Sequence, residues 1–424
     1  VRELSGGNKD RENVGQLLGA AKVLRERFGR VYLGFDTPIS LRAFLEDEGV
    51  DIAAGWESPA QKRLIVKRLA YRVLGGINHV AVATATSVVA AALLTSSKRG
   101  LSLDALVHRV GTIVDYLLSR GAPLASGLKT PLAANRVALE HTRVPTSSSH
   151  AGALHALTGN AERAQVLDVA LRDLVVETAE LFVGHKQLSC HSYQEAGEAA
   201  PQRVYQVPSD HRIDLDYYKN NLGHHFANEG ILASALLRCL RTDDTFGDRL
   251  RKEALFLSDL LKLEYVFGQE LTFEGQYVET LRSFEQAGLL TADRAARVVV
   301  ESHARPILHL LASMVMPVIE GYFVVAHGTA QMTEPIEKGE LREQLQTLGE
   351  RMWREGRLRF REAVSSVVFD NGYTWLTREG YLTRSTRQSG RKVLTYYEPG
   401  PLQVDHPTAA AELAQRLETF LMVR

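Results

Sequence analysis

Along most of the chain, apolar residues recur every three or four positions, which is the spacing of one face of an α-helix. Near the start, residues 12–28 show this spacing at Val14, Leu17, Ala21 and Leu24. The same spacing predicts further helices over residues 59–75, 77–95, 102–120, 131–141, 161–184, 248–265, 276–288, 303–327, 341–356 and 361–371. The chain is therefore expected to be mainly α.

A different pattern occupies residues 31–35, VYLGF, where a short apolar run predicts a β-strand. Pro38 then turns the chain, and Ser40 is placed to cap a helix over residues 41–49. No second strand follows nearby, and a lone strand would leave its backbone donors and acceptors unpaired. We therefore expect residues 1–50 to be the end of an α/β domain whose other strands lie upstream of the first residue.

The middle of the chain, residues 51–333, is expected to form a helical bundle. Its main interruption is the segment 188–207, whose pattern is typical of a loop with a short strand or hairpin. From Asp216 onward the helical spacing returns strongly and places five apolar residues on one face: Leu222, Phe226, Leu232, Leu236 and Leu240. Packing of such faces against one another would provide the core of this region.

The last part, residues 334–424, is predicted to be a small α+β module that resembles a winged helix. A charged linker over residues 334–343 precedes two of the predicted helices, and a two-stranded β-wing follows them. Winged modules often bind DNA, and five cations lie near this wing: Arg378, Arg384, Arg387, Arg391 and Lys392. The helix ahead of the wing carries few side chains that read bases, so we expect a protein-facing or structural wing and no nucleic acid partner.

Composition and charge narrow the possible roles. The 424 residues contain 50 Lys plus Arg and 50 Asp plus Glu, so zero net charge gives no general attraction to nucleic acid or anionic lipid. The two cysteines, Cys190 and Cys239, are too few for a disulfide framework and indicate a reducing compartment. The chain begins with neither Met nor a signal-peptide pattern, so we expect it to be a piece of a longer protein.

Two apolar segments approach the length of a membrane span. They cover residues 77–94 and 307–325. The first contains Asn78 and His79 and the second contains Glu320, and such polar groups are costly in lipid. Both segments are therefore predicted to be buried core helices.

The most specific candidate for catalysis is the pair His211 and Asp216, which has H-x4-D spacing. This spacing is used where a histidine base deprotonates an acceptor hydroxyl and an aspartate orients the imidazole. However, five positions along a helix separate two side chains by about 140°, so the pair could cooperate only across a turn. We therefore interpret the pair as a decoy and expect Asp216 to begin a helix.

Other histidines give weaker signals. His185, Cys190 and His191 offer three potential metal ligands without a fourth, and neighbours in sequence usually diverge, so no metal site is expected. His224 and His225 lie about 100° apart on a helix, which makes them a poor chelate. They are predicted to form hydrogen bonds within a helix interface.

Six groups of segments form an ordered set of landmarks along the chain. They are ELSGGNKDRE from residue 3, VYLGFDTPISLRAFL, then INHVAVATATSVVAAALL followed by RGLSLDAL and RGAPLA, then YYKNNLGHH, LSDLLKLEYVF and PVIEGYFVV. The first resembles an EL-x-G-x-x-K-x-x-E segment and the second a V-x-V-x-F-x-x-P-x-S-L-x-x-Y-L segment. On these landmarks the chain resembles the glycerol-3-phosphate acyltransferases of the bacterial membrane type and their mitochondrial and peroxisomal relatives.

The resemblance implies an enzyme that transfers a fatty acyl group from acyl-CoA or acyl carrier protein to the first hydroxyl of sn-glycerol 3-phosphate, in phosphatidate synthesis. It implies no cofactor beyond the acyl donor as co-substrate. It also implies a membrane surface as partner and a location at the cytoplasmic face of the bacterial inner membrane. Dihydroxyacetone phosphate remains an alternative acceptor. Lys9 matches the lysine of EL-x-G-x-x-K, so a substrate-binding contact with phosphate or CoA is expected there.

The chain also departs from the family. There, a catalytic H-x4-D and a phosphate-binding F-x-E-G-x-R-S precede EL-x-G-x-x-K-x-x-E, which begins at residue 3 here. The nearest fragments of the second motif, at Phe273 and Ile319, lack the Arg-Ser. The resemblance therefore implies that the catalytic residues lie upstream of Val1 and that this chain alone is inactive. The alternative is a non-catalytic helical scaffold or interaction module with a winged-helix tail.

Overall fold

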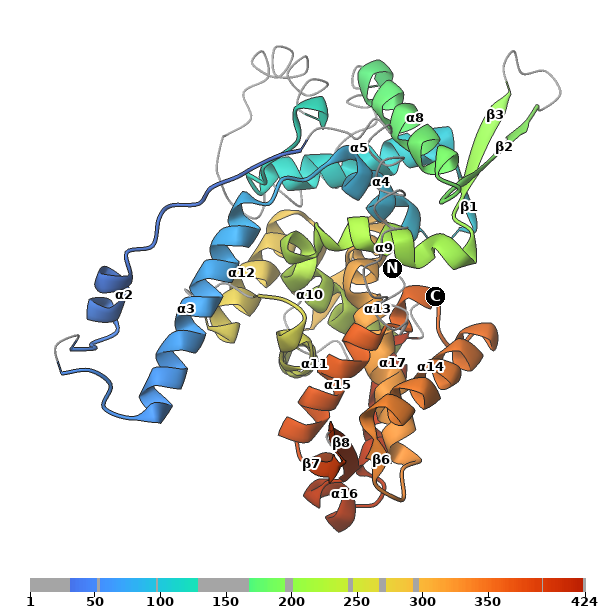
Figure 1. Ribbon diagram of the computed structural model, residues 1–424. Helices are drawn as coiled ribbons and strands as arrows, with labels where there is room; N and C mark the ends of the chain where they lie inside the picture. The colour runs from blue at the N-terminus through green and yellow to red at the C-terminus, as the bar shows by residue number, and fades with distance from the viewer. Residues whose placement is uncertain are drawn as a thin grey trace, which may run out of the picture.

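Two long helices lie at the centre of the molecule, and the other elements surround them (Figure 1). The computed structural model describes residues 31–51, 54–96, 98–128, 168–194, 201–242, 247–266, 272–292, 297–390 and 392–421. In this part the central helices are α10 (Gly223–Arg241) and α13 (Arg305–Ala330), which pack along each other. The predicted mainly α fold is confirmed. The helices predicted over residues 12–28 and 131–141 lie outside the described residues.

Helix α13 is apolar on every side because other elements cover it. Together with the preceding turn, it is the one helix among the described residues that is long and apolar enough to cross a membrane. However, 83% of its apolar window is buried inside the protein. This burial agrees with the predicted core helix, since the apolar side chains already contact other parts of the chain.

A layer of four helices covers one end of the central pair (Figure 1). The short apolar helix in its middle has eight buried residues and contacts the three others. The layer consists of α4 (Ala85–Leu94), α5 (Leu103–Ser119), α8 (Asp168–Gly184) and α9 (Arg212–Asn220). Such complete burial explains why α4 carries no charged residue.

The hairpin predicted within residues 188–207 is confirmed. Its strands join a third short strand in an antiparallel sheet, in which Tyr205 lies opposite both Leu101 and Cys190. The strand order is β1 (Gly100–Ser102), β3 (Gln202–Gln206) and β2 (Ser189–Tyr193). The buried ring of Tyr205 anchors the sheet to the helices beside it.

The single helix predicted over residues 77–95 is wrong, because the chain breaks between two helices. Helix α3 (Pro59–Val80) ends before Ala83, which forms a parallel bridge with Leu124. Thr84 then accepts a hydrogen bond from the backbone N–H of Ser87 and caps α4. The continuous apolar run hid this break, since a hydroxyl residue at an N-cap interrupts a helix without interrupting the apolar pattern.

Between α10 and α13 the chain forms two helices and a second small hairpin. The helices predicted over residues 248–265 and 276–288 both exist, with ends shifted by a few positions. The elements are α11 (Gly247–Leu260), a 3₁₀ turn (Leu261–Leu263), α12 (Phe273–Gln286), β4 (Leu290–Ala292) and β5 (Val298–Val300). Helices α11 and α12 both pack against α10.

The predicted winged-helix-like module is an α+β unit with an antiparallel sheet of order β6, β8, β7. The predicted charged linker over residues 334–343 is wrong, because the Glu337 carboxylate accepts from the backbone N–H groups of Gly339 and Glu340 and begins a helix there. The elements are β6 (Ile336–Glu337), α14 (Lys338–Arg354), a 3₁₀ turn (Arg361–Ala363), α15 (Ser366–Arg378), β7 (Leu382–Ser389) and β8 (Lys392–Pro399).

Two further helices end the chain, α16 (Pro401–Asp405) and α17 (Ala409–Leu421), and neither was predicted. Helix α17 packs along α13 and also contacts α10. One cluster of buried apolar side chains therefore runs from Ala83 to Leu421. The division of the chain at residues 50 and 333 stays a prediction, although helices on both sides of the second boundary share this core.

The strand predicted over residues 31–35, whose partners were expected upstream of the first residue, is not formed among the described residues. Val31, Leu33 and Phe35 are 85%, 83% and 91% exposed, and residues 31–40 are neither helical nor paired with a strand in the described part of the chain. A strand requires a hydrogen-bonded neighbour, and none of the described strands pairs with this segment. The following cap is as predicted, since the Ser40 hydroxyl accepts from Ala43 N–H at the start of α2 (Leu41–Asp47).

Candidate functional site

The two residues of the H-x4-D motif do not come together. His211 ends a 3₁₀ turn immediately before α9, and its Nδ1 lies 2.7 Å from Oδ2 of Asp214. Asp216 contacts other groups further along α9. The imidazole is thus oriented by Asp214, so the arrangement needed for a His211–Asp216 base is not formed.

Asp216 is held by two residues of its own helix. Its Oδ1 lies 2.7 Å from Nζ of Lys219, and its Oδ2 accepts a hydrogen bond of 2.8 Å from Asn220. Burial raises the pKa of the Asp216 carboxyl, and the charge of Lys219 offsets part of this rise. The prediction that Asp216 begins a helix is wrong, because α9 begins at Arg212 and Asp216 lies inside it.

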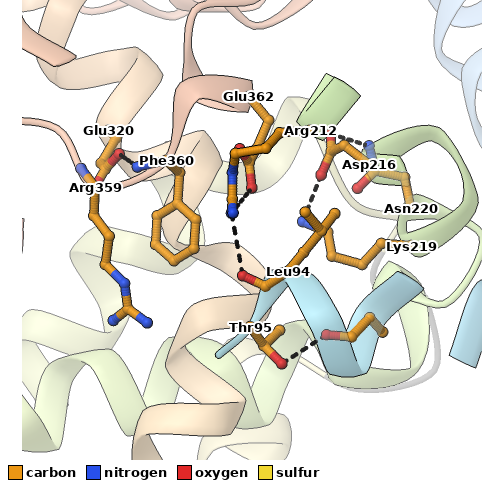
Figure 2. Close-up of polar contacts among 11 residues, drawn as sticks. Leu94, Thr95, Arg212, Asp216, Lys219, Asn220, Glu320, Arg359, Phe360 and Glu362 are labelled. Carbon is orange, nitrogen blue, oxygen red and sulfur yellow. Dashed lines mark hydrogen bonds and ion pairs between the residues drawn. The ribbon is translucent and has the colours of Figure 1, made fainter. Parts of the chain in front are cut away.

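Arg212 contacts residues far away in the sequence, whereas the polar contacts of His211 and Asp216 are with residues close to them in the sequence. Its guanidinium donates two hydrogen bonds of 2.8 Å to the two carboxylate oxygens of Glu362 and a third of 3.3 Å to the carbonyl oxygen of Leu94 (Figure 2). The Glu362 side chain is only 1% exposed. Burial alone would raise the pKa of Glu362, but the charge and hydrogen bonds of Arg212 and the charge of Lys219 together outweigh burial and lower it. The pair is therefore ionised and links α4, α9 and the turn before α15.

Glu320 is a buried carboxyl in the middle of α13. Its two oxygens accept hydrogen bonds from the backbone N–H groups of Arg359 at 3.0 Å and Phe360 at 2.8 Å (Figure 2). Burial raises the pKa of Glu320 to about 8, although these two hydrogen bonds oppose the shift. At neutral pH the carboxyl is therefore mainly protonated and carries little charge.

Five residues thus form what we call the polar junction: Arg212, Asp216, Lys219, Glu320 and Glu362 (Figure 2). With a proton on Glu320, two cations lie among two carboxylates and the charges balance. Every carboxyl in the junction accepts from a neighbouring side chain or backbone N–H. The junction therefore connects α4, α9, α13 and the segment before α15 and offers no free carboxylate as a base.

Sequence reasoning missed this junction. Arg212 and Glu362 are 150 positions apart, and no local pattern connects two such distant residues. One signal was present: Glu320 stands inside a long apolar helix, and a buried carboxyl requires hydrogen-bond partners. The sequence could indicate that partners exist but not that they are backbone groups of residues 359 and 360.

His224 and His225 lie in a helix interface, as predicted, with ring centroids 3.9 Å apart. Burial lowers the pKa of both, and that of His225 falls to about 3, so both rings are neutral at physiological pH. The predicted hydrogen bonding is only partial, because neither Nε2 atom has a partner among the described residues. This neutral pair, whose rings are tilted by 42° to each other, contributes packing rather than charge.

The three potential metal ligands are spread over a helix end and a strand. His185 follows α8, whereas Cys190 and His191 are neighbours on β2 and point to opposite faces of the sheet. No group of three metal-ligating side chains occurs within the ranges that the structure describes. That no metal is required stays a prediction.

The cations of the wing are partly engaged within the protein. Arg378 forms ion pairs with Asp259 and Glu379, and the guanidinium of Arg387 lies 4.4 Å from the ring centroid of Tyr396. Arg384 and Lys392 lie on the two wing strands, and Arg391 is outside the described residues. The expectation of no nucleic acid partner stays untested.

Lys9, the residue expected to contact substrate, also lies outside the described residues. Among the described residues, the one H-x4-D pair also does not form the catalytic arrangement of the family that the chain resembles, because His211 contacts Asp214 and not Asp216. Comparison with protein families gives one clear result. The family model described as the glycerol-3-phosphate acyltransferase C-terminal region matches residues 1–169 and 157–385.

Proposed function

Because the chain belongs to the family of the glycerol-3-phosphate acyltransferase C-terminal region, we propose that it is the helical part of a glycerol-3-phosphate 1-O-acyltransferase. The observation that carries this proposal is the extent of the match, from residue 1 to residue 385. A match over so much of the chain includes both central helices and extends to the first residues of β7. The proposed product is lysophosphatidate, the precursor of phosphatidate.

The proposed reaction defines what the protein must supply. The first hydroxyl oxygen of sn-glycerol 3-phosphate attacks the thioester carbonyl of the acyl donor, the new C–O bond forms, and the C–S bond breaks. A base accepts the hydroxyl proton, and the thiol of CoA or of the carrier protein leaves. The phosphate of the acceptor requires guanidinium or backbone N–H donors.

The described residues support a structural role for this chain in that reaction. His211 and Asp216 form the chain's H-x4-D pair, and they do not contact each other. The carboxylates of the polar junction are bound within the protein. We therefore propose that the base and the phosphate site belong to residues outside this chain, and that the 424 residues alone do not catalyse acyl transfer.

The proposed function also includes the substrates of the enzyme and its location in the cell. The acceptor is sn-glycerol 3-phosphate, with dihydroxyacetone phosphate as the alternative, and the donor is acyl-CoA or acyl carrier protein. The donor itself supplies the reactive thioester, so no further cofactor is proposed. The fatty acyl product favours action at a membrane surface, at the cytoplasmic face of the bacterial inner membrane.

An acyl-transfer assay tests the proposal. The protein translated from the complete reading frame is incubated with radiolabelled sn-glycerol 3-phosphate and palmitoyl-CoA or palmitoyl carrier protein, and labelled lysophosphatidate is measured. We expect product with at least one donor and faster reaction than with labelled dihydroxyacetone phosphate. Absence of transfer to either acceptor with either donor would favour the alternative of a non-catalytic helical scaffold.

A further inference from the structure

Helix α3 lies at the edge of the molecule, beside α2 and away from the wing (Figure 1). Although it is 22 residues long, Ile65 is its single buried residue, and Ile65 is not part of the main core cluster. Most side chains of α3 are therefore directed towards solvent. A long helix that shares so little of the core requires another reason for its apolar residues.

The exposed apolar residues of α3 form a stripe. Val66, Val73 and Ile77 are 53%, 44% and 56% exposed, and the exposed Ala70 lies between them in sequence. Their spacing of four, three and four places all four residues along one face. We call these four residues the α3 stripe.

The charges of α3 have one sign. The helix contains Lys62, Arg63, Lys67, Arg68 and Arg72 but no Asp or Glu. In a chain with zero net charge, this makes α3 a local concentration of positive charge. Arg68 is partly neutralised by an ion pair with Glu48 of the preceding segment.

Three of these cations border the stripe. At 100° per residue, Lys62 and Arg63 lie within about 60° of the stripe's centre and Lys67 within about 100°. Lys62 lies over the ring of Trp56, with its Nζ 6.0 Å from the ring centroid, and Lys67 lies 5.8 Å from that of Tyr71. An apolar stripe with lysines at its edges, and with amphipathic aromatic rings beside those lysines, is typical of helices that lie in a membrane interface.

A groove beside the stripe has the same chemistry. It has a volume of about 250 Å³ and lies between α3 and residues 262–266. Tyr71, Leu74 and Tyr265 contribute apolar surface, and Lys67 and Lys262 contribute positive charge. Glu264 also lines the groove, and burial raises the pKa of its carboxyl to about 7, which reduces its negative charge near neutral pH. A phospholipid presents the complementary features, an apolar chain and an anionic phosphate.

From these observations we propose that α3 is the membrane-contacting element of this chain and docks on a bilayer that contains anionic phospholipid. The apolar window of α13 is 83% buried and is not available for this contact. In the docked state the α3 stripe enters the headgroup boundary, and Lys62, Arg63 and Lys67 contact lipid phosphates. The inference rests on the proposed action at a membrane surface and names the residues responsible.

Vesicle flotation of the full chain tests this inference. Vesicles of phosphatidylcholine are compared with a one-to-one mixture of phosphatidylcholine and phosphatidylglycerol, and we expect binding to the mixture that weakens with added salt. The double change Lys62→Gln and Lys67→Gln should reduce partitioning by about fivefold for each cation, or roughly 25-fold. Val73→Glu should reduce it roughly tenfold by removing apolar contact.

Matched variants control for charge and for exposed apolar area. Lys252→Gln with Arg354→Gln removes the same charge elsewhere, and Val393→Glu changes a valine that is 70% exposed on the wing. Both controls should bind vesicles as the unchanged chain does. Equal vesicle binding by the α3 variants and the unchanged chain would overturn the inference. It would also be overturned if the α3 substitutions changed the oligomeric state of the chain and left vesicle binding unchanged.

A separate measurement distinguishes this inference from the proposed function. Acyl transfer by the protein from the complete reading frame is assayed in detergent micelles, where binding to a bilayer is not needed. Loss of vesicle binding in the α3 variants with retained transfer in detergent supports both proposals. If the unchanged protein transfers no acyl group but the variants still lose vesicle binding, the proposed function fails and the membrane-contacting role of α3 stands.

Discussion

At the scale of single residues, the contacts of Arg212 and of its neighbour His211 contribute very differently to stability. Arg212 donates two hydrogen bonds to a carboxylate that is 1% exposed, whereas the side chain of His211 is 39% exposed and pairs with Asp214. Removing one partner of a buried ion pair leaves an uncompensated charge, while a surface pair contributes little. His211, which belongs to the H-x4-D spacing, and Arg212, which forms the buried ion pair, are thus adjacent in sequence, but their contacts contribute unequally to the free energy of unfolding.

Substitution of these two neighbours should separate their roles. We expect Arg212→Ala to lower the free energy of unfolding by about 3–5 kcal/mol because Glu362 is left buried and unpaired. We expect His211→Ala to lower it by less than about 1 kcal/mol. Urea denaturation followed by circular dichroism measures both. The double change Arg212→Met with Glu362→Leu should recover most of the loss, and a failure to recover would contradict the buried-pair argument.

Glu320 should make stability depend on pH. The pKa of this carboxyl is raised from 4.5 to about 8 in the folded protein. Between these values the unfolded chain loses its proton first, so rising pH favours unfolding, and the dependence ends above about pH 8. The unfolding free energy of the unchanged chain relative to that of Glu320→Gln, which does not titrate, should therefore fall from pH 5 to pH 8. A constant difference across this range would show that Glu320 is not the responsible group.

Sequence alone could not predict the polar junction, although it identified two of its five members. Asp216 was recognised by its spacing from His211, which lies outside the junction, and Glu320 by its place in an apolar segment. Their partners come from contacts between distant elements, such as the 150-position separation of Arg212 and Glu362. Local spacing reports which residues share a helix face, but it does not report which helices meet.

At the scale of elements, the contact between α10 and α13 depends on a glycine. A Cβ at Gly230 would lie 2.8 Å from Cγ1 of Val315 and 2.9 Å from the carbonyl oxygen of Leu311. The valine can shift, but the backbone oxygen belongs to the neighbouring helix and cannot move alone. The absence of a side chain at this position therefore sets how closely the two central helices pack.

Two glycine-to-alanine changes should have opposite effects. Gly230→Ala should lower the free energy of unfolding by about 1–3 kcal/mol because the added methyl group forces the helices apart. Gly75→Ala should raise it by about 0.5–1 kcal/mol, since nothing lies within 4 Å of a Cβ there and alanine favours the helix. Thermal denaturation of both variants measures the changes. Stabilisation by Gly230→Ala would contradict the close packing.

Helices with periodic apolar faces could be predicted from the sequence. Elements that depend on contact with a distant segment were harder to predict. Helix α5 was predicted to within one residue at each end because Ser102 caps its start and its apolar spacing is regular. The strand over residues 31–35 was predicted from a short apolar run, yet strand formation also requires a hydrogen-bonded neighbour, and no described strand provides one. Helix α17 was missed, although its contact with α13 contributes much to the core.

At the scale of the whole molecule, α17 returns the end of the chain to the central helices. Leu417 and Phe420 of this helix are fully buried and belong to the cluster that extends back to Ala83. A core shared between the helical bundle and the C-terminal module couples their stability. The two parts are therefore expected to unfold together.

Two probes should detect a single unfolding transition. Fluorescence reports mainly on Trp353 and Trp375 in the C-terminal module, because the third tryptophan, Trp56, is already 40% exposed, while far-ultraviolet circular dichroism reports on all helices. The two urea curves should coincide. Leu417→Ala should shift both to lower urea concentration by reducing the free energy of unfolding by about 2–5 kcal/mol. Gln415→Ala, at an exposed position of the same helix, is the control. Separate transitions would instead indicate independent domains at the predicted boundary.

In the proposed function, this chain supports an acyltransferase without supplying its catalytic base. The most direct test is the initial rate of lysophosphatidate formation by the protein from the complete reading frame with His211→Ala. Since the imidazole contacts Asp214 rather than Asp216, we expect a rate within about twofold of that of the unchanged protein. A loss of about 10²-fold or more, with folding retained, is the effect of removing a general base and would contradict the claim.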